Sequence, residues 1–178
     1  MDYSLIELQV EQGIATLTLN RPDKRNAMSD GMRTEFIHAL EHITADKAIK
    51  ALVLTGAGRG FCAGADLSEF DFSEGPNAIE RADPGPVIDQ CFNPTTRRLQ
   101  RSRVPIIAAV NGVAAGAGAS LVMACDIAIA APNASFIQAF SKIGLIPDAG
   151  GSWFLVERLG LARAMALAMT GDKLTAAQ

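Results

Sequence analysis

The sequence predicts an α/β domain, because short apolar strands alternate with amphipathic helices along most of its length. Two observations support this fold class. The chain opens with two strand-like runs joined by a tight turn. Later, the apolar runs Ala51–Thr55 and Ile106–Val110 are each followed by a segment rich in glycine and alanine. A chain of 178 residues is long enough for one domain with a sizeable core, and we assign residues 1–178 to one.

The first half of the chain predicts a hairpin, a helix and a buried strand. Leu5–Val10 and Gly13–Leu19 are expected to pair, since residue character alternates along them with a period of two. Apolar residues then recur at helical spacing from Ser29 to Ala45, which predicts an amphipathic helix. Ala51–Thr55 predicts a short buried strand, and a further helix is expected to begin within Ala65–Phe70.

The second half predicts strands around a buried helix. Ile106–Val110 and Asp126–Ala130 are the expected strands, with a helix over Gly118–Cys125 between them. A last helix is predicted over Leu161–Met169. Asp71–Asp89 is rich in glycine, proline and acidic residues, so we expect it to be a mobile loop that covers a bound ligand.

Composition excludes several classes of function. The net charge of −3, without a cluster of basic and aromatic residues, argues against a nucleic-acid partner. The three cysteines, Cys62, Cys91 and Cys125, are an odd number at unrelated spacings, which favours reduced thiols in a cytoplasmic protein. The longest apolar stretch, Val104–Val122, contains an asparagine and three glycines, and the first residues do not resemble a signal peptide. We therefore expect no membrane partner.

Two segments indicate a site for an anionic oxygen. Phe61–Leu67 and Asn111–Ala119 each follow a strand-like run, and their glycines and alanines let a ligand approach the main chain closely. We expect each segment to lead into a helix, whose first N–H groups are unpaired and carry partial positive charge. Two such N–H groups that face one point would stabilise a developing oxyanion. This chemistry suits acyl groups, and the enolates of thioesters in particular.

These segments belong to an ordered set of motifs that resembles the enoyl-CoA hydratase/isomerase (crotonase) superfamily. The set comprises Asn20–Ala27, Phe61–Leu67, Asn111–Ala119, Cys125-Asp126-Ile127 and Ile143–Gly151. The resemblance implies a right-handed spiral of ββα turns with two sheets, here truncated before the family's C-terminal helices. It also implies an acyl-CoA substrate, assembly as a homotrimer or homohexamer, and no cofactor or metal, because CoA is part of the substrate.

The resemblance also implies the catalytic groups. Ala65 and Ala117 match the positions whose backbone N–H groups form the oxyanion hole. Hydratases of the family use two glutamates, whose positions are held here by Ser120 and Phe140, so a hydratase is disfavoured. Asp148 matches the catalytic aspartate of several isomerases and the nucleophile of 4-chlorobenzoyl-CoA dehalogenase. From the residues alone, Asp148 is also a candidate N-cap for the following helix.

The resemblance places the adenine and pantetheine path of CoA along two segments, Lys24–Ala27 and Ala63–Leu67. Lys24 and Arg25 could meet phosphates, or they could form a solvated basic turn. Asp66 is expected at a helix start near the nucleotide and is not assigned a catalytic role. The positions that the resemblance places along the CoA and substrate path are Lys24, Arg25, Ala27, Ala63, Asp66, Leu67 and Phe140.

Within the superfamily, three segments resemble the branch of ring-epoxide isomerases in phenylacetate degradation. They are Thr55–Gly64, Phe92-Asn93-Pro94 and Ala139–Asp148. The leading hypothesis is therefore an acyl-CoA isomerase that shifts a double bond or opens a ring epoxide, with Asp148 as the acid/base. A hydratase with unusual residues, a dehalogenase and a non-catalytic acyl-CoA binding protein remain alternatives.

Overall fold

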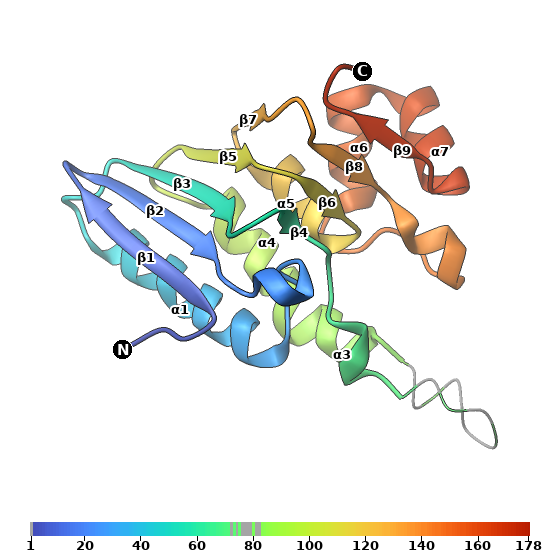
Figure 1. Cartoon of the computed structure of the whole chain (residues 1–178), viewed down its shortest axis with the longest axis horizontal. Helices are drawn as coiled ribbons and strands as arrows, with labels where there is room; N and C mark the ends of the chain where they lie inside the picture. The colour runs from blue at the N-terminus through green and yellow to red at the C-terminus, as the bar shows by residue number, and fades with distance from the viewer. Residues whose placement is uncertain (1, 72, 74, 76–79, 81–82) are drawn as a thin grey trace.

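The computed structural model, which describes residues 2–71, 73, 75, 80 and 83–178, contains two sheets (Figure 1). The larger sheet has the strand order β1-β2-β3-β5-β7, and the smaller one has the order β4-β6-β8-β9. The larger sheet comprises β1 (Ile6–Glu11), β2 (Ile14–Leu19), β3 (Ala51–Gly56), β5 (Ile106–Val110) and β7 (Ile127–Ala130). The smaller sheet comprises β4 (Gly60–Cys62), β6 (Val113–Ala115), β8 (Ser135–Ile137) and β9 (Lys173–Thr175).

Three successive strand pairs build most of the two sheets. β3 and β4, β5 and β6, and β7 and β8 each contribute their first strand to the larger sheet and their second to the smaller one. Neighbouring pairs run parallel in both sheets, with registers such as Leu54↔Ala108 and Ala114↔Phe136. Each pair therefore repeats the path of the one before it, which is the predicted crotonase-like arrangement of ββα turns.

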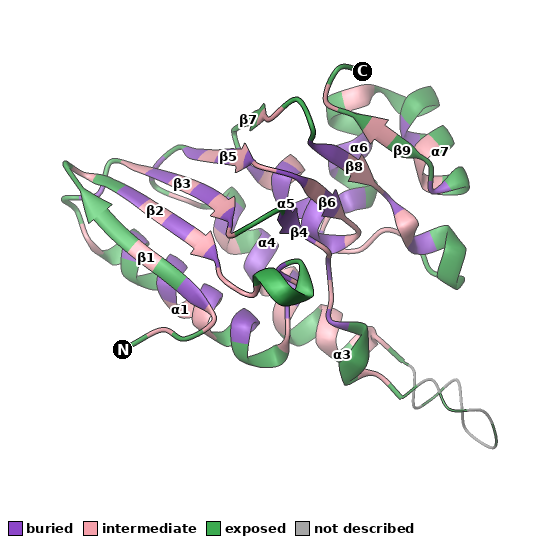
Figure 2. Cartoon of the chain, in the orientation of Figure 1, coloured by how far each residue is buried: buried purple, intermediate pink, exposed green. Residues whose placement is uncertain are grey.

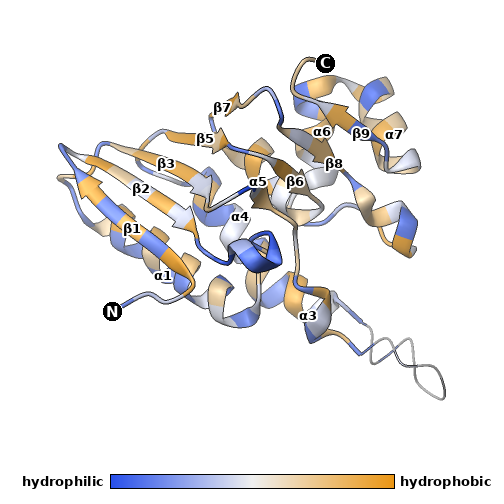
Figure 3. Cartoon of the chain, viewed as in Figure 1, coloured by the Kyte–Doolittle hydropathy of each residue, from blue (hydrophilic) through white to orange (hydrophobic). Residues whose placement is uncertain are grey.

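Helices cover the sheets and close the core. They are α1 (Asp30–Ala45), α3 (Gly85–Val87), α4 (Asn93–Gln100), α5 (Ala117–Ala124), α6 (Gly151–Leu159) and α7 (Leu161–Thr170). Figure 2 shows buried residues where α1, α4 and α5 face the sheets, whereas the outer strand β1 is largely exposed. The hydropathy colouring follows the same division on α1 (Figure 3). Fully burying one large apolar side chain such as Phe36 contributes roughly 1.5–3 kcal/mol.

The hairpin, the long first helix and the central strands confirm the sequence predictions. α1 begins where expected, because the Ser29 hydroxyl accepts a hydrogen bond from the Met32 N–H at 3.4 Å and caps the helix. The sequence analysis missed the short strands of the smaller sheet. With three residues each, β4, β6, β8 and β9 are too short to display an alternating pattern.

The prediction that a helix begins within Ala65–Phe70 is wrong about the start and the length of the helical segment. The structure forms only a 3₁₀ turn over Leu67–Glu69, with Asp66 as its N-cap. The preceding residues are held extended, because Gly64 accepts from the Met28 N–H at 2.8 Å and Asp66 donates to the Met28 carbonyl at 3.2 Å. Ala65 thus forms a parallel β-bridge with Met28 and does not begin a helix.

The predicted mobile loop Asp71–Asp89 falls partly outside the described residues, which omit 72, 74, 76–79, 81 and 82. From Gly85 onward the segment is helical, because α3 continues into a π-helical turn over Ile88–Phe92 and then into α4. The loop prediction is therefore wrong for Gly85–Asp89. Across the described ranges, every helix is too short or too polar to cross a membrane.

Candidate active site

The smaller sheet places three segments at one edge. Because β4, β6 and β8 run parallel, the residues that follow them emerge on the same side. Gly64 marks how closely the first two segments approach, since its φ is +92°. A Cβ atom there would lie 2.9 Å from the Ala115 carbonyl oxygen and 3.3 Å from the Ala117 nitrogen. A side chain at this position would push the two segments apart.

A cavity of about 200 Å³ lies between these segments. Six of the predicted site residues line it: Ala63, Ala65, Leu67, Ala117, Phe140 and Asp148. Pro84, Val87 and Ile88 also line it and belong to Asp71–Asp89, the segment expected to cover a ligand. The sequence analysis did not assign the other lining residues, which are mostly apolar: Gly64, Phe70, Phe92, Ala115, Gly116, Ala139, Lys142, Ile143 and Leu145. Their helical or glycine-rich contexts gave no individual signal, since it is the fold that gathers them.

Two backbone N–H groups of this cavity have no hydrogen-bond partner among the described residues. In the bridge with Met28, the flanking Gly64 and Asp66 make the hydrogen bonds, so the N–H of Ala65 points away from Met28. Ala117 is the first residue of α5, where the N–H lacks an intrahelical acceptor and the helix dipole adds partial positive charge. Of these two donors, only the Ala117 N–H lies at the N-terminus of a helix.

Asp148 lies in the same cavity with a buried carboxyl group. Its Oδ1 atom has no hydrogen-bond partner among the described residues, and burial raises the pKa of this carboxyl to about 6. The N-cap alternative is wrong, because α6 begins at Gly151 with Gly150 as its N-cap. The Asp148 backbone carbonyl, rather than its side chain, accepts the Gly151 N–H at 2.7 Å. The carboxyl group is therefore not used as a helix cap.

Ser120 and Phe140 both have structural roles that fit the absence of a glutamate pair. Ser120 is buried in α5 against the Asp148 loop, where a Cβ on Gly151 would lie 2.6 Å from its Oγ. The ring of Phe140 packs toward Gly116, where its Cζ lies 3.5 Å from an ideal Cβ position, and forms part of the cavity wall. Neither side chain supplies a second acid or base.

Ser120→Ala is expected to leave activity within about twofold of the wild type, because this hydroxyl makes one long hydrogen bond of 3.4 Å to the Gly116 carbonyl. Steady-state kinetics and a thermal melt measure the effect, with the exposed Ser152→Ala as the matched control. A large fall in kcat in a folded Ser120→Ala protein would show that the hydroxyl positions water or substrate.

The two expected CoA segments lie side by side, but only the second, which contains Ala63 and Leu67, lines the cavity. The Ala63 N–H donates to the Arg25 carbonyl at 3.0 Å, which joins the basic turn to the first cavity segment. Asp66 has a structural role, because its carboxyl group accepts a hydrogen bond from the Ser68 hydroxyl and pairs with Arg21 at 2.9 Å. These two contacts hold the pKa of the Asp66 carboxyl below its ordinary range. Lys24, Arg25, Ala27 and Asp66 do not line the cavity.

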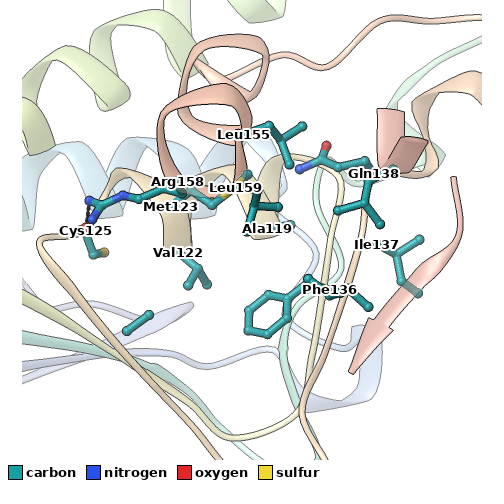
Figure 4. Close-up of a pocket in the computed structure, with 13 residues that line it drawn as sticks. Ala119, Val122, Met123, Cys125, Phe136, Ile137, Gln138, Leu155, Arg158 and Leu159 are labelled. Carbon is teal, nitrogen blue, oxygen red and sulfur yellow. Dashed lines mark hydrogen bonds between the residues drawn. The ribbon is translucent and has the colours of Figure 1, made fainter. Parts of the chain in front are cut away.

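A second cavity, of about 210 Å³, contains none of the predicted site residues (Figure 4). It is mostly apolar and lies among α5, α6, α7 and the smaller sheet. Its buried Gln138 amide has no hydrogen-bond partner among the described residues, and Arg158 donates to the Cys125 carbonyl at 2.8 Å. Burial raises the pKa of the Cys125 thiol to about 12, so this thiol is not a nucleophile at neutral pH.

The raised pKa of Asp148 predicts a pH-dependent stability. Because the folded-state pKa of about 6 exceeds the ordinary 3.8, ionising this carboxyl destabilises the fold by at most about 3 kcal/mol. The contribution of the neutral Asp148 carboxyl to the free energy of unfolding is therefore fully present below pH 4 and is lost as pH rises through 6. Asp148→Asn should therefore unfold at a higher temperature than the wild type at pH 8, with little advantage at pH 4. Melts across this range measure the difference; equal shifts at both pH values would contradict it.

Comparisons with known proteins agree with this architecture. The sequence profile described as enoyl-CoA hydratase/isomerase matches residues 9–178. The 1,2-epoxyphenylacetyl-CoA isomerase of Escherichia coli K12 is 49% identical over 170 residues, which cover 95% of this chain and 63% of that protein. The 2,3-dehydroadipyl-CoA hydratase of the same organism is 37% identical, over 94% of this chain and 62% of that protein.

Solved structures lead to the same family. The crystal structure of an enoyl-CoA hydratase from Mycobacterium avium subsp. paratuberculosis K-10 superposes with a TM-score of 0.85 at 33% identity. The match covers 99% of this chain and 64% of that one, so the chain spans less than two thirds of each of these three relatives. On sequence and structure together, the chain belongs to the enoyl-CoA hydratase/isomerase family.

Proposed function

We propose that the protein is an acyl-CoA isomerase that works through an enolate. The observation that supports this proposal most directly is the composition of the cavity. It combines two unpaired backbone N–H groups, from Ala65 and Ala117, with one carboxyl group, from Asp148. No second carboxylate lines the cavity among the described residues. A proton shift needs one acid/base group, whereas hydration needs two.

In the proposed mechanism, the thioester carbonyl oxygen accepts hydrogen bonds from the N–H groups of Ala65 and Ala117. The Asp148 carboxylate removes a proton alpha to the carbonyl, or one conjugated to it, and the electron pair moves onto the carbonyl oxygen. The two N–H groups stabilise the resulting enolate. In a double-bond shift, protonated Asp148 then returns the proton to a different carbon. In a ring epoxide, the enolate pair instead forms a double bond between the alpha carbon and the neighbouring ring carbon, the C–O bond at that ring carbon breaks, and the epoxide oxygen takes the proton from Asp148. A pKa of about 6 leaves Asp148 mostly ionised at neutral pH yet basic enough for this step.

The cavity wall suits an apolar or ring-containing acyl group. The aromatic residues Phe70, Phe92 and Phe140 line it together with aliphatic side chains of α3 and the π-helical turn. An E. coli relative is named a 1,2-epoxyphenylacetyl-CoA isomerase. The compound in that name carries a six-membered ring. We therefore infer that a ring epoxide of a phenylacetyl thioester is the substrate class, with double-bond shifts in linear enoyl thioesters as the alternative.

The remaining functional expectations are part of the same proposal. Lys24 and Arg25 would contact CoA phosphates beyond the cavity, and CoA would enter as part of the substrate with no separate cofactor or metal. The whole protein would act in the cytoplasm as a homotrimer or homohexamer, a state that light scattering measures directly.

A second candidate function follows from the Asp148 carboxylate, whose Oδ1 atom has no hydrogen-bond partner among the described residues. Such a group could attack an aromatic carbon as a nucleophile and displace halide, as in the dehalogenase alternative. The hydratase alternative draws on relatives that carry that name, such as the E. coli 2,3-dehydroadipyl-CoA hydratase. A protein that binds acyl-CoA without turnover is the alternative from another class.

The deciding experiment is a side-by-side assay with 3-enoyl-CoA, 2-enoyl-CoA, the phenylacetyl-CoA ring epoxide and 4-chlorobenzoyl-CoA. Turnover of the epoxide or the 3-enoyl thioester to an isomer of equal mass supports the proposal. A gain of one water from 2-enoyl-CoA, or release of chloride, would replace it with one of the rival reactions. Binding of all four thioesters without any product would identify a binding protein.

A further inference from the structure

Thr96 lies on α4, 53 residues before Ala149 in the sequence, yet both branches of its side chain reach the loop that carries Asp148. The Thr96 hydroxyl donates to the Ala149 carbonyl at 3.1 Å. Its methyl carbon lies 3.1 Å from the position that a Cβ on Gly150 would occupy. Thr96 is buried, so these contacts are shielded from water.

The loop requires such contacts because its backbone conformation is unfavourable. Ala149 has a φ of +49° and Gly150 a φ of +77°, both in the left-handed region. Glycine adopts this region freely, but alanine rarely does, because its Cβ approaches the following carbonyl. A non-glycine residue keeps such a conformation only when tertiary contacts hold it there. Thr96 supplies one of them immediately after Asp148.

The hydroxyl of Thr96 links α4 to this loop. In a helix, a threonine hydroxyl commonly donates to the carbonyl four residues earlier, and Phe92 is within reach at 2.9 Å. Its single proton is thus shared between the Phe92 and Ala149 carbonyls. Phe92 is also part of the cavity wall, so Thr96 connects that wall to the loop that carries Asp148.

We propose that Thr96 is a positioning residue for Asp148, whose hydroxyl holds the Ala149–Gly150 turn so that the Asp148 carboxyl group stays in the cavity. This inference rests on the proposed role of Asp148. The opposing explanation is that Thr96 only fills space in the core, in which case its methyl would matter and its hydroxyl would not.

Three variants separate these explanations. Thr96→Val keeps the shape and removes the hydroxyl, whereas Thr96→Ser keeps the hydroxyl and removes the methyl. Thr95→Val is the matched control, because Thr95 is the neighbouring buried threonine and makes no side-chain hydrogen bond with the described residues. Thr96→Ala provides a second hydroxyl-free variant should the valine prevent folding.

The first measurement is the pKa of the Asp148 carboxyl by carbon NMR on protein with labelled aspartate, which requires no catalytic activity. Among the residues that the structure describes, Lys142 is the other charged side chain of the cavity, and it is present in every variant. In the hydroxyl-free variants the turn should relax and admit water to the carboxyl, so its pKa falls from about 6 toward 3.8. Thr96→Ser and Thr95→Val should keep the wild-type pKa.

The second measurement is steady-state kinetics on whichever thioester the protein turns over. Thr96→Val should lower kcat by about tenfold or more with little change in KM, and Thr96→Ser should restore it, because small misplacements of a catalytic group are costly. A folded hydroxyl-free variant with the wild-type pKa would overturn the proposal, as would a lowered pKa in Thr96→Ser. Because the NMR result is independent of turnover, it stands or falls separately from the proposed isomerase activity.

Discussion

Asp148→Asn is expected to lower the rate of isomerisation by about 10²–10⁴, the usual cost of losing a general base. The amide keeps the shape of the carboxyl group but has no basic oxygen, so the substrate proton has no acceptor. Binding of a CoA thioester should be nearly unchanged, because the substrate contacts assigned to Ala65 and Ala117 remain. Steady-state kinetics together with calorimetric titration of an unreactive thioester measure both quantities.

The control for this variant is Asp172→Asn, which removes an equal charge from an exposed residue outside the cavity. It should match the wild type in kcat and KM. If Asp148→Asn retained activity within a factor of two, Asp148 would have no part in the mechanism. If it lost binding and activity together, the carboxyl group would be a substrate-binding group rather than a base.

Ala117→Pro is expected to lower kcat by about 10²–10³, because it deletes one of the two proposed oxyanion donors. Proline is normally tolerated at the first position of a helix, where its missing N–H would have had no intrahelical partner. Ala117 occupies this position in α5, and its N–H makes no hydrogen bond with any described residue. The substitution therefore removes the donor without removing a bond of the fold.

Ala117→Gly is the matched control, since it changes the side chain and retains the N–H. Its kcat should remain within a few-fold of the wild type, and thermal melts should show that both variants are folded. A folded Ala117→Pro protein with normal kcat would exclude this N–H from the site. An equal loss in the glycine variant would assign the effect to the alanine methyl group instead.

The hairpin, α1 and the strands β3, β5 and β7 were predictable because their signals are local. An alternating pattern identifies a strand, and apolar residues at helical spacing identify α1, whose Ser29 cap is visible in the sequence. The ordered motifs also led to Ala65, Ala117 and Asp148, although through resemblance. The three-residue strands of the smaller sheet could not be predicted, because pairing across distant segments, rather than local pattern, holds them in place.

The sequence by itself determined the fold class, the family and the residues of the proposed site. Only the tertiary structure decided the state of each group. The bridge to Met28 leaves the Ala65 N–H unpaired without any helix there, and Gly150 takes the capping position that the sequence had allowed for Asp148. The pKa of Asp148 and its contact through Thr96 depend on burial among segments from different parts of the chain. Local propensity acts over a few residues, whereas desolvation and hydrogen bonding depend on which distant residues become neighbours.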